Sequence, residues 1–161
     1  MMENAGIVLL ISCYELGHQP AGLTGPMAFV RRAGFEVEAV DLSVQGLDAA
    51  QVARASFVGI SVPMHTALRL GVEVAQRVRE LNPTCHICFY GLYAILNQDH
   101  LLATVADSVL GGESEQGLVE IVDRAGQGKS ETLSEDSSRQ PALAGKRGSR
   151  AISRPLDFPR P

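Results

Sequence analysis

The segment GIVLLISCYELGHQPAGL, residues 6–23, decides the fold of this chain. Its first eight residues, Gly6 to Cys13, are mostly apolar, which is typical of a strand buried on both faces of a parallel sheet. A long loop with glycines and a proline follows and leads into a segment of helical character, Leu23 to Ala33. A loop of this length after a first parallel strand is typical of a ligand-binding loop.

The same alternation continues to Ala125 and predicts one α/β domain over residues 1–125. We expect a flavodoxin-like (Rossmann-like) doubly wound fold with a five-stranded parallel sheet. The further strands are expected at Phe35–Asp41, Phe57–Val62, His86–Tyr90 and Ser108–Leu110. The further helices are expected at Asp48–Ala55, Thr66–Leu81, Leu92–Thr104 and Glu115–Ala125, with Leu70, Val74, Val78 and Leu81 forming the buried face of the third helix.

From Gly126 onward the composition shifts to Ser, Gly, Gln, Arg and Pro, which predicts a disordered linker or tail over residues 126–161. Its last stretch, Arg154–Pro161, suits an extended segment laid on a neighbouring surface, and an untethered tail fits the composition equally well. Residues 1–125 carry seven basic and fourteen acidic side chains, and the remainder carries seven and four. An acidic domain argues against a nucleic-acid partner, because phosphate binding needs clustered positive charge.

The first apolar run is too short to cross a bilayer and lacks the features of a signal peptide, so we expect a cytoplasmic protein without membrane association. The three cysteines make a disulfide framework improbable in such a protein. Cys85 and Cys88 are spaced as in redox and zinc motifs. Within a strand, however, side chains three apart point to opposite faces, so both are expected in the core.

The loop after the first strand matches none of the common phosphate-binding motifs. It lacks the Gly-x-Gly-x-x-Gly of dinucleotide sites and the Gly-Lys-Ser/Thr of Walker A loops. Glu15 and Asp41 stand alone, so no acidic cluster suitable for a phospho-acceptor is expected. His18 is the only strong metal ligand in the loop, and hydrogen bonding to backbone or water is the more common role of such a histidine.

Other candidate residues follow the later strands. Ser61 is expected at the end of the third strand, where its hydroxyl can donate or accept in the crevice. Thr66 is expected to cap the helix that follows, and His65 to lie solvated at the loop tip. Gly91, Gly111 and Gly112 leave main chain without side chains at the same edge, which lets a large ligand approach.

Four segments together resemble a known family: Ile11–Pro20, Gly59–Thr66, Cys88–Tyr93 and Gly111–Glu113. They are similar to the cobalamin-binding domain at the front of cobalamin-dependent radical SAM proteins, especially a subgroup named for cysteine- or selenocysteine-containing C-terminal tails. The resemblance covers about residues 6 to 125 and lies in the order of the loops more than in any single motif.

The resemblance implies a flavodoxin-like sheet that binds cobalamin, with the nucleotide tail of the cofactor between the first and third strands and the corrin ring over the strand ends. It implies that Ser61 hydrogen-bonds the tail, that Gly91 lines its slot, and that Gly111 and Gly112 pass close to it. The cofactor-binding candidates are Tyr14, Glu15, Gly17, His18, Ser61, Val62, Pro63, Gly91, Leu92, Tyr93, Gly111, Gly112 and Glu113.

Two departures from the family pattern matter. Members whose histidine ligates cobalt carry Asp-x-His-x-x-Gly, whereas Leu16 and Ala21 stand at the Asp and Gly positions here. A histidine-off corrinoid is therefore expected, with His18 not a cobalt ligand. Leu92 also replaces a second glycine often found after the fourth strand, which changes the slot for the tail.

The chain has no Cys-x-x-x-Cys-x-x-Cys triplet for an iron–sulfur cluster. S-adenosylmethionine and the cluster would therefore belong to a radical SAM domain acting in cis or in trans, and no catalysis is expected from this chain alone. Two alternatives remain open from the residues. One is a small flavodoxin-like enzyme that uses Glu15, His18 and Glu113 as acid and base groups, and the other is a regulatory interaction domain without a ligand.

Overall fold

A computed structural model describes residues 6–127, which form a five-stranded parallel sheet in the order β2-β1-β3-β4-β5. Strand β1 lies between β2 and β3, and all six of its residues are buried. Every neighbouring pair of strands is parallel, and the pairing of β1 with β3 brings Ser12 opposite Ser61. The strands are β1 (Ile7–Ser12), β2 (Val37–Asp41), β3 (Ala55–Ser61), β4 (His86–Tyr90) and β5 (Ser108–Leu110).

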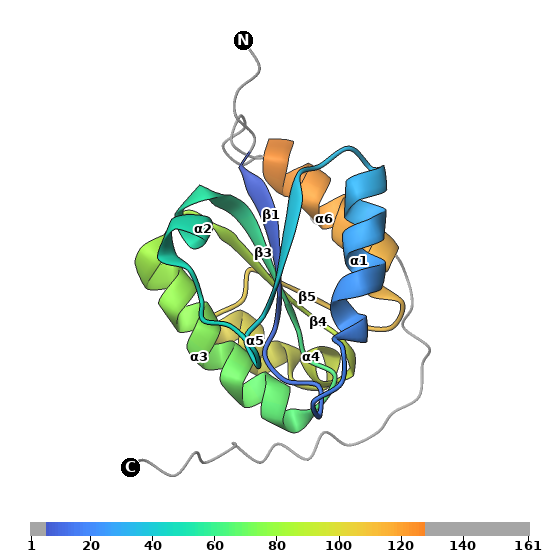
Figure 1. The fold of residues 1–161 in the computed structure, drawn as a ribbon, viewed down its shortest axis with the longest axis vertical. Coiled ribbons are helices and arrows are strands. Elements are labelled where there is room, and N and C mark those ends of the chain that lie inside the picture. The colour runs from blue at the N-terminus through green and yellow to red at the C-terminus, as the bar shows by residue number, and fades with distance from the viewer. Residues whose placement is uncertain (1–5, 128–161) are drawn as a thin grey trace.

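Helices cover both faces of the sheet (Figure 1). Helices α1 and α6 lie on one face, and their residues share an apolar cluster with Val8, Leu10 and Phe57. The other helices pack on the opposite face around Leu9, Ile11 and Ile60. The helices are α1 (Ala21–Arg32), α2 (Ala49–Arg54), α3 (His65–Leu81), α4 (Leu92–Leu96), α5 (Gln98–Thr104) and α6 (Ser114–Gln127).

The flavodoxin-like doubly wound fold expected from the sequence is confirmed, and β4 and β5 have the predicted bounds. The predicted single helix over residues 92–104 is wrong. Asn97 has φ −121° and ψ 21°, outside helical values, and its side chain donates to the carbonyl of Tyr93 at 2.8 Å. The helix is therefore divided into α4 and α5. The last helix, expected at Glu115–Ala125, continues to Gln127. Residues 128–161, including the Arg154–Pro161 stretch, lie outside the described part.

The face that α3 buries agrees with the prediction only in part. Val78 is buried and Val74 and Leu81 pack against the core, but Leu70 does not. Leu70 is 37% exposed, and small residues contact the sheet instead: a Cβ on Gly71 would lie 3.1 Å from Ile60 and 3.2 Å from Phe89. The apolar spacing located the helix correctly, but a close approach to the sheet selects small side chains for the contact face. The buried residues of α3 are Ala67, Leu68, Gly71, Ala75 and Val78.

The cysteines are core residues, as predicted. Cys85 and Cys88 are buried in the apolar clusters on opposite faces of the sheet. Burial raises the pKa of Cys88, and likewise that of Cys13, to about 12, so both thiols stay protonated at neutral pH. Protonated buried thiols are poor nucleophiles and poor metal ligands. Within residues 6–127, no helix has the length and apolar character needed to cross a membrane.

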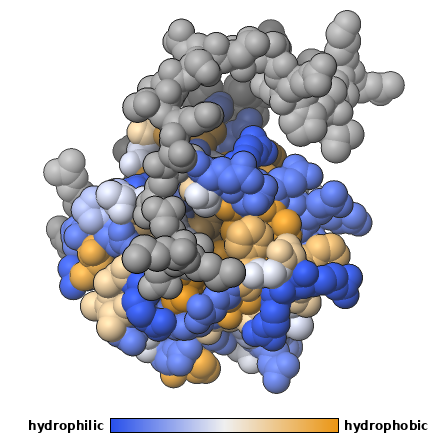
Figure 2. Space-filling view, turned by 90° about the horizontal axis from the view of Figure 1, so that it is seen from above, coloured by the Kyte–Doolittle hydropathy of each residue, from blue (hydrophilic) through white to orange (hydrophobic). Residues whose placement is uncertain are grey.

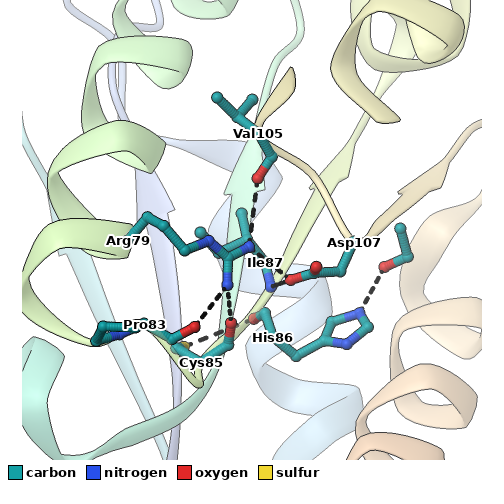
Figure 3. A network of polar contacts seen from close by, with 8 residues as sticks. Arg79, Pro83, Cys85, His86, Ile87, Val105 and Asp107 are labelled. Atoms are coloured by element: carbon teal, nitrogen blue, oxygen red, sulfur yellow. Dashed lines mark hydrogen bonds and ion pairs between the residues drawn. The ribbon is translucent and has the colours of Figure 1, made fainter. Parts of the chain in front are cut away.

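The edge at which the strands begin is fixed by Arg79 of α3 (Figure 3). Its guanidinium donates to the carbonyls of Pro83, Cys85 and Val105 and pairs with the Asp107 carboxylate at 2.8 Å.

In the view from above, hydrophobic residues gather near the middle of the visible surface among hydrophilic ones (Figure 2). An open depression of about 260 Å³ beside Arg79 is lined by Gln76, Arg79, Glu80, Thr104 and Val105. Because Arg79 already has four acceptors, this depression offers no free cation for a ligand.

Candidate functional site at the carboxyl ends of the strands

The candidate site lies at the opposite edge, where the strands end. The chain leaves β1 toward α1 on one face and leaves β3 toward α3 on the other, although β1 and β3 are neighbours in the sheet. Such a switch point separates two loops and opens a crevice between them. The loop Cys13–Pro20 follows β1 and the turn Val62–Met64 follows β3 at this edge.

Three hydroxyl groups stand in a row across the sheet at this edge. Ser12 pairs with Ser61, and Ser61 pairs with Tyr90, in the parallel registers of β1, β3 and β4. Strand residues two apart share a face. Ser12 therefore faces the α1 side with Leu10, and Tyr90 belongs to the cluster on that side. All three residues are buried, at 1%, 3% and 2% exposure. We call Ser12, Ser61 and Tyr90 the hydroxyl row.

Tyr90 connects this row to α1. Its hydroxyl donates to the carbonyl of Gly22 at 2.6 Å. In a regular helix that carbonyl would accept from the N–H of residue 26, but Pro26 has no N–H to give. Burial raises the pKa of Tyr90 well above its usual range, and a hydrogen bond with Ser61 opposes part of that rise. The hydroxyl therefore remains a donor at every pH at which the protein would be studied.

Glu15 caps the start of α1 from the preceding loop. Its carboxylate accepts from the backbone N–H groups of Ala21 at 2.8 Å and Gly22 at 3.2 Å. Pro20 at the N-cap position provides no side-chain cap, so these N–H groups would otherwise lack protein partners. A carboxylate there also interacts favourably with the helix dipole. Glu15 is thus engaged in holding the loop against α1.

The first turn of α1 lies directly over the hydroxyl row. Any Cβ added to Gly22 would collide with the hydroxyl of Ser61, and it would lie 3.0 Å from the Glu15 carboxylate. Only glycine allows this approach. The chemistry of the row suits a ligand group that forms hydrogen bonds. In this arrangement the backbone of Gly22 lies against the hydroxyl of Ser61.

The predicted glycines have three different roles. Gly91 has φ +113°, and a Cβ there would lie 3.0 Å from the carbonyl oxygen of Val62, so the turn after β4 requires glycine. Gly111 packs against Ile95, with a Cβ expected 2.8 Å from that side chain. Gly112 has φ +68° and no atom within 4 Å of a Cβ position, so it forms an open turn. Gly17 likewise has φ +76° in open space.

Apolar side chains are exposed in the segments that follow β1 and β4. Leu16 and Leu92 are 64% and 60% exposed, and Leu16 holds a positive φ of 52° that is unusual for a residue with a side chain. Tyr14 and Tyr93 are partly buried against the core. The rings of His65 and Tyr93 contact edge-on, with their centroids 6.5 Å apart. Exposed apolar side chains of this kind can be covered by a flat apolar group.

The structure does not assemble the acid–base set. His18 and Glu113 are exposed, Glu15 is engaged with α1, and no side-chain hydrogen bond or ion pair joins the three within the described residues. The expected cap at Thr66 is also wrong. Met64 occupies the N-cap position without a side-chain hydrogen bond, and Thr66 lies inside the first turn of α3. Val62 is buried and Pro63 partly buried beside the crevice.

Three residues of this site were not among the sequence candidates: Ser12, Gly22 and Tyr90. Ser12 could have been found from alternation, since it ends a strand of otherwise apolar residues on the face of Val8 and Leu10. Pro26 signalled a helix carbonyl in need of another donor, but the sequence alone does not show which donor supplies it.

Comparison of the whole fold finds response-regulator receiver domains among solved structures. A receiver domain protein of CheY type from Methanospirillum hungatei JF-1 is 15% identical with a TM-score of 0.56, covering 77% of this chain and 95% of that one. The receiver domain of AraT, a response regulator from Geobacillus stearothermophilus, is 17% identical with a TM-score of 0.53, covering 78% and 95%. A response regulator from Thermotoga maritima is 13% identical with a TM-score of 0.55, covering 76% of this chain and 98% of that one.

No family model and no curated protein matches the chain. Identities this low establish the shared fold and leave the chemistry to the site. A hydroxyl row occupies the ends of β1, β3 and β4 here, and residues 6–127 contain no group of three His, Cys, Asp or Glu side chains able to hold a metal ion. The chain is a five-stranded parallel domain with the flavodoxin-like fold that receiver domains share.

Proposed function

We propose that this domain binds cobalamin at the carboxyl ends of β1 and β3 and presents the corrinoid to a radical SAM domain outside this chain. The observation that carries the proposal is the hydroxyl row, Ser12, Ser61 and Tyr90, buried beneath the glycine-rich start of α1 at the switch point. The resemblance of the four loop segments supports the same assignment. A bound corrinoid would supply the organometallic chemistry, while these residues bind and orient it.

The residues of the edge divide into two groups under this proposal. The exposed side chains of Leu16 and Leu92, together with Tyr14 and Tyr93, provide apolar contact for the ring. Ser61 binds the nucleotide tail, and Gly91 keeps the adjacent turn free of a side chain. His18 is exposed in a loop without the Asp and Gly of the ligating motif, which supports a histidine-off mode.

Reconstitution of the purified chain with hydroxocobalamin tests the proposal, because a bound corrinoid absorbs visible light. Ser61→Ala should weaken binding by roughly tenfold to a hundredfold, since it removes a buried hydrogen bond worth about 1–3 kcal/mol. Ser108→Ala provides a control, because Ser108 bonds His86 at the other end of the sheet. Equal affinity of the Ser61→Ala variant and the wild type would remove Ser61 from the site.

A further inference from the structure

Ser12 has a side chain that no part of the fold explains. Its hydroxyl is buried, at 1% residue exposure, and has no hydrogen-bond partner among the described residues. A buried polar group without a partner costs free energy, so native proteins rarely retain one without a reason. Alanine would fit the same strand without that cost.

The position of Ser12 supplies a reason. It is paired with Ser61 in the register of β1 and β3, on the face covered by α1. Adjacent strands lie about 4.8 Å apart, so two paired side chains on one face can contact the same small group. Ser61 already interacts with Tyr90, and Tyr90 is satisfied by Gly22. Ser12 is therefore the member of the row with a free donor and a free acceptor.

We infer that Ser12 is a second hydrogen-bonding residue for the nucleotide tail, and that it makes the domain selective for complete corrinoids over those that lack the tail. This inference rests on the proposed function and adds a residue and a ligand preference to it. The two serines would contact the tail from adjacent strands, one on each side of the switch point. A ligand without the tail leaves Ser12 unsatisfied and gains nothing from it.

The test compares hydroxocobalamin with hydroxocobinamide, which has the ring but not the nucleotide tail, on wild type and Ser12→Ala. We expect Ser12→Ala to weaken hydroxocobalamin binding about tenfold and to leave hydroxocobinamide binding unchanged. Without ligand, the variant should unfold at the same temperature as wild type or a few degrees higher, because an unsatisfied group is removed.

Ser56→Ala is the matched control. Ser56 lies near the start of β3, and its hydroxyl donates to the carbonyl of Gly6, the residue before β1, at 2.9 Å. Its loss should lower the thermal midpoint and leave both affinities intact. A fall in the midpoint of Ser12→Ala like that of Ser56→Ala would show that Ser12 serves the fold and would overturn the inference.

The binding data distinguish the role of Ser12 from cobalamin binding by the domain. If wild type binds hydroxocobalamin and Ser12→Ala binds it equally well, or loses both corrinoids equally, the role of Ser12 is wrong and the proposed function stands. If wild type binds neither corrinoid, the proposed function and the inference fall together.

Discussion

The hydroxyl of Tyr90 donates to the carbonyl of Gly22 at 2.6 Å, the carbonyl that Pro26 leaves without its helical donor. A side chain from the end of β4 thus completes the backbone hydrogen bonding of α1. The same bond places the first turn of α1 over Ser61. The stability of α1 and the geometry of the candidate site therefore both depend on the side chain of Tyr90.

This relationship predicts a coupled pair of substitutions. Tyr90→Phe removes the donor and leaves the Gly22 carbonyl unsatisfied, so the free energy of unfolding should fall by about 1–3 kcal/mol. Pro26→Ala restores a backbone N–H at the right position, so Tyr90→Phe should cost less in that background. Urea unfolding of the four proteins measures the coupling. Identical losses in both backgrounds would mean that the proline does not create the need for Tyr90.

Glu15 should matter to α1 through its charge as well as its oxygen atoms. Glu15→Gln keeps an acceptor but removes the carboxylate at the helix N-terminus, and we expect a loss of about 0.5–1 kcal/mol in the free energy of unfolding. Glu120→Gln, on the exposed face of α6, is the comparison and should change stability by less. Chemical denaturation of both variants provides the measurement, and equal effects would argue against the capping role.

Arg79 should be the most important surface arginine. Arg79→Gln removes donors to three carbonyls and the pair with Asp107, so we expect a loss of about 1–2 kcal/mol. Arg77 lies in the same helix and pairs only with exposed Glu80 at 2.9 Å. Arg77→Gln should cost less than about 0.5 kcal/mol. Matched thermal and urea unfolding of the two variants tests this ranking, which similar losses would refute.

His86 predicts a dependence of stability on pH. Burial lowers its pKa, with Asp107 opposing and Arg79 adding to the shift, and its ring stacks on Phe57 at 5.3 Å. A lowered pKa means that the unfolded chain binds the proton more tightly than the folded protein does. The contribution is complete above about pH 6.5, the unfolded value, and is lost as pH falls through the folded value.

Unfolding free energies between pH 8 and pH 5 measure this contribution. His86→Gln keeps a group that can bond Ser108 but cannot titrate. The variant should be less stable than wild type at pH 7, and the difference should shrink as pH falls. A difference independent of pH would show that His86 does not titrate differently in the folded and unfolded states.

Local patterns in the sequence were sufficient for the architecture. The short apolar runs and their turn residues predicted β4 and β5 to the residue, because Gly91 follows β4 and Asp107 and Gly111 bound β5. The division of α4 from α5 was missed because it depends on the side chain of Asn97 binding the Tyr93 carbonyl. The contact face of α3 was predicted only in part, with Val78 correct and Leu70 wrong, because the distance between helix and sheet is a tertiary property.

The candidate site was predicted only in part. Ser61 and Gly91 lie at strand ends, which a strand assignment fixes directly. The hydroxyl row depends on register between β1, β3 and β4, and register between parallel strands joined by long crossovers cannot be deduced from one sequence. The role of Glu15 was missed for a different reason, because its partners Ala21 and Gly22 depend on the path of the loop.

Titration of the purified chain with hydroxocobalamin, followed by visible absorbance after removal of free ligand, tests directly whether the domain binds cobalamin. We predict one corrinoid retained per chain, with a spectrum that His18→Ala leaves nearly unchanged. A protein that remains colourless after this treatment would contradict the account, and a large spectral change on His18→Ala would contradict the histidine-off mode of binding.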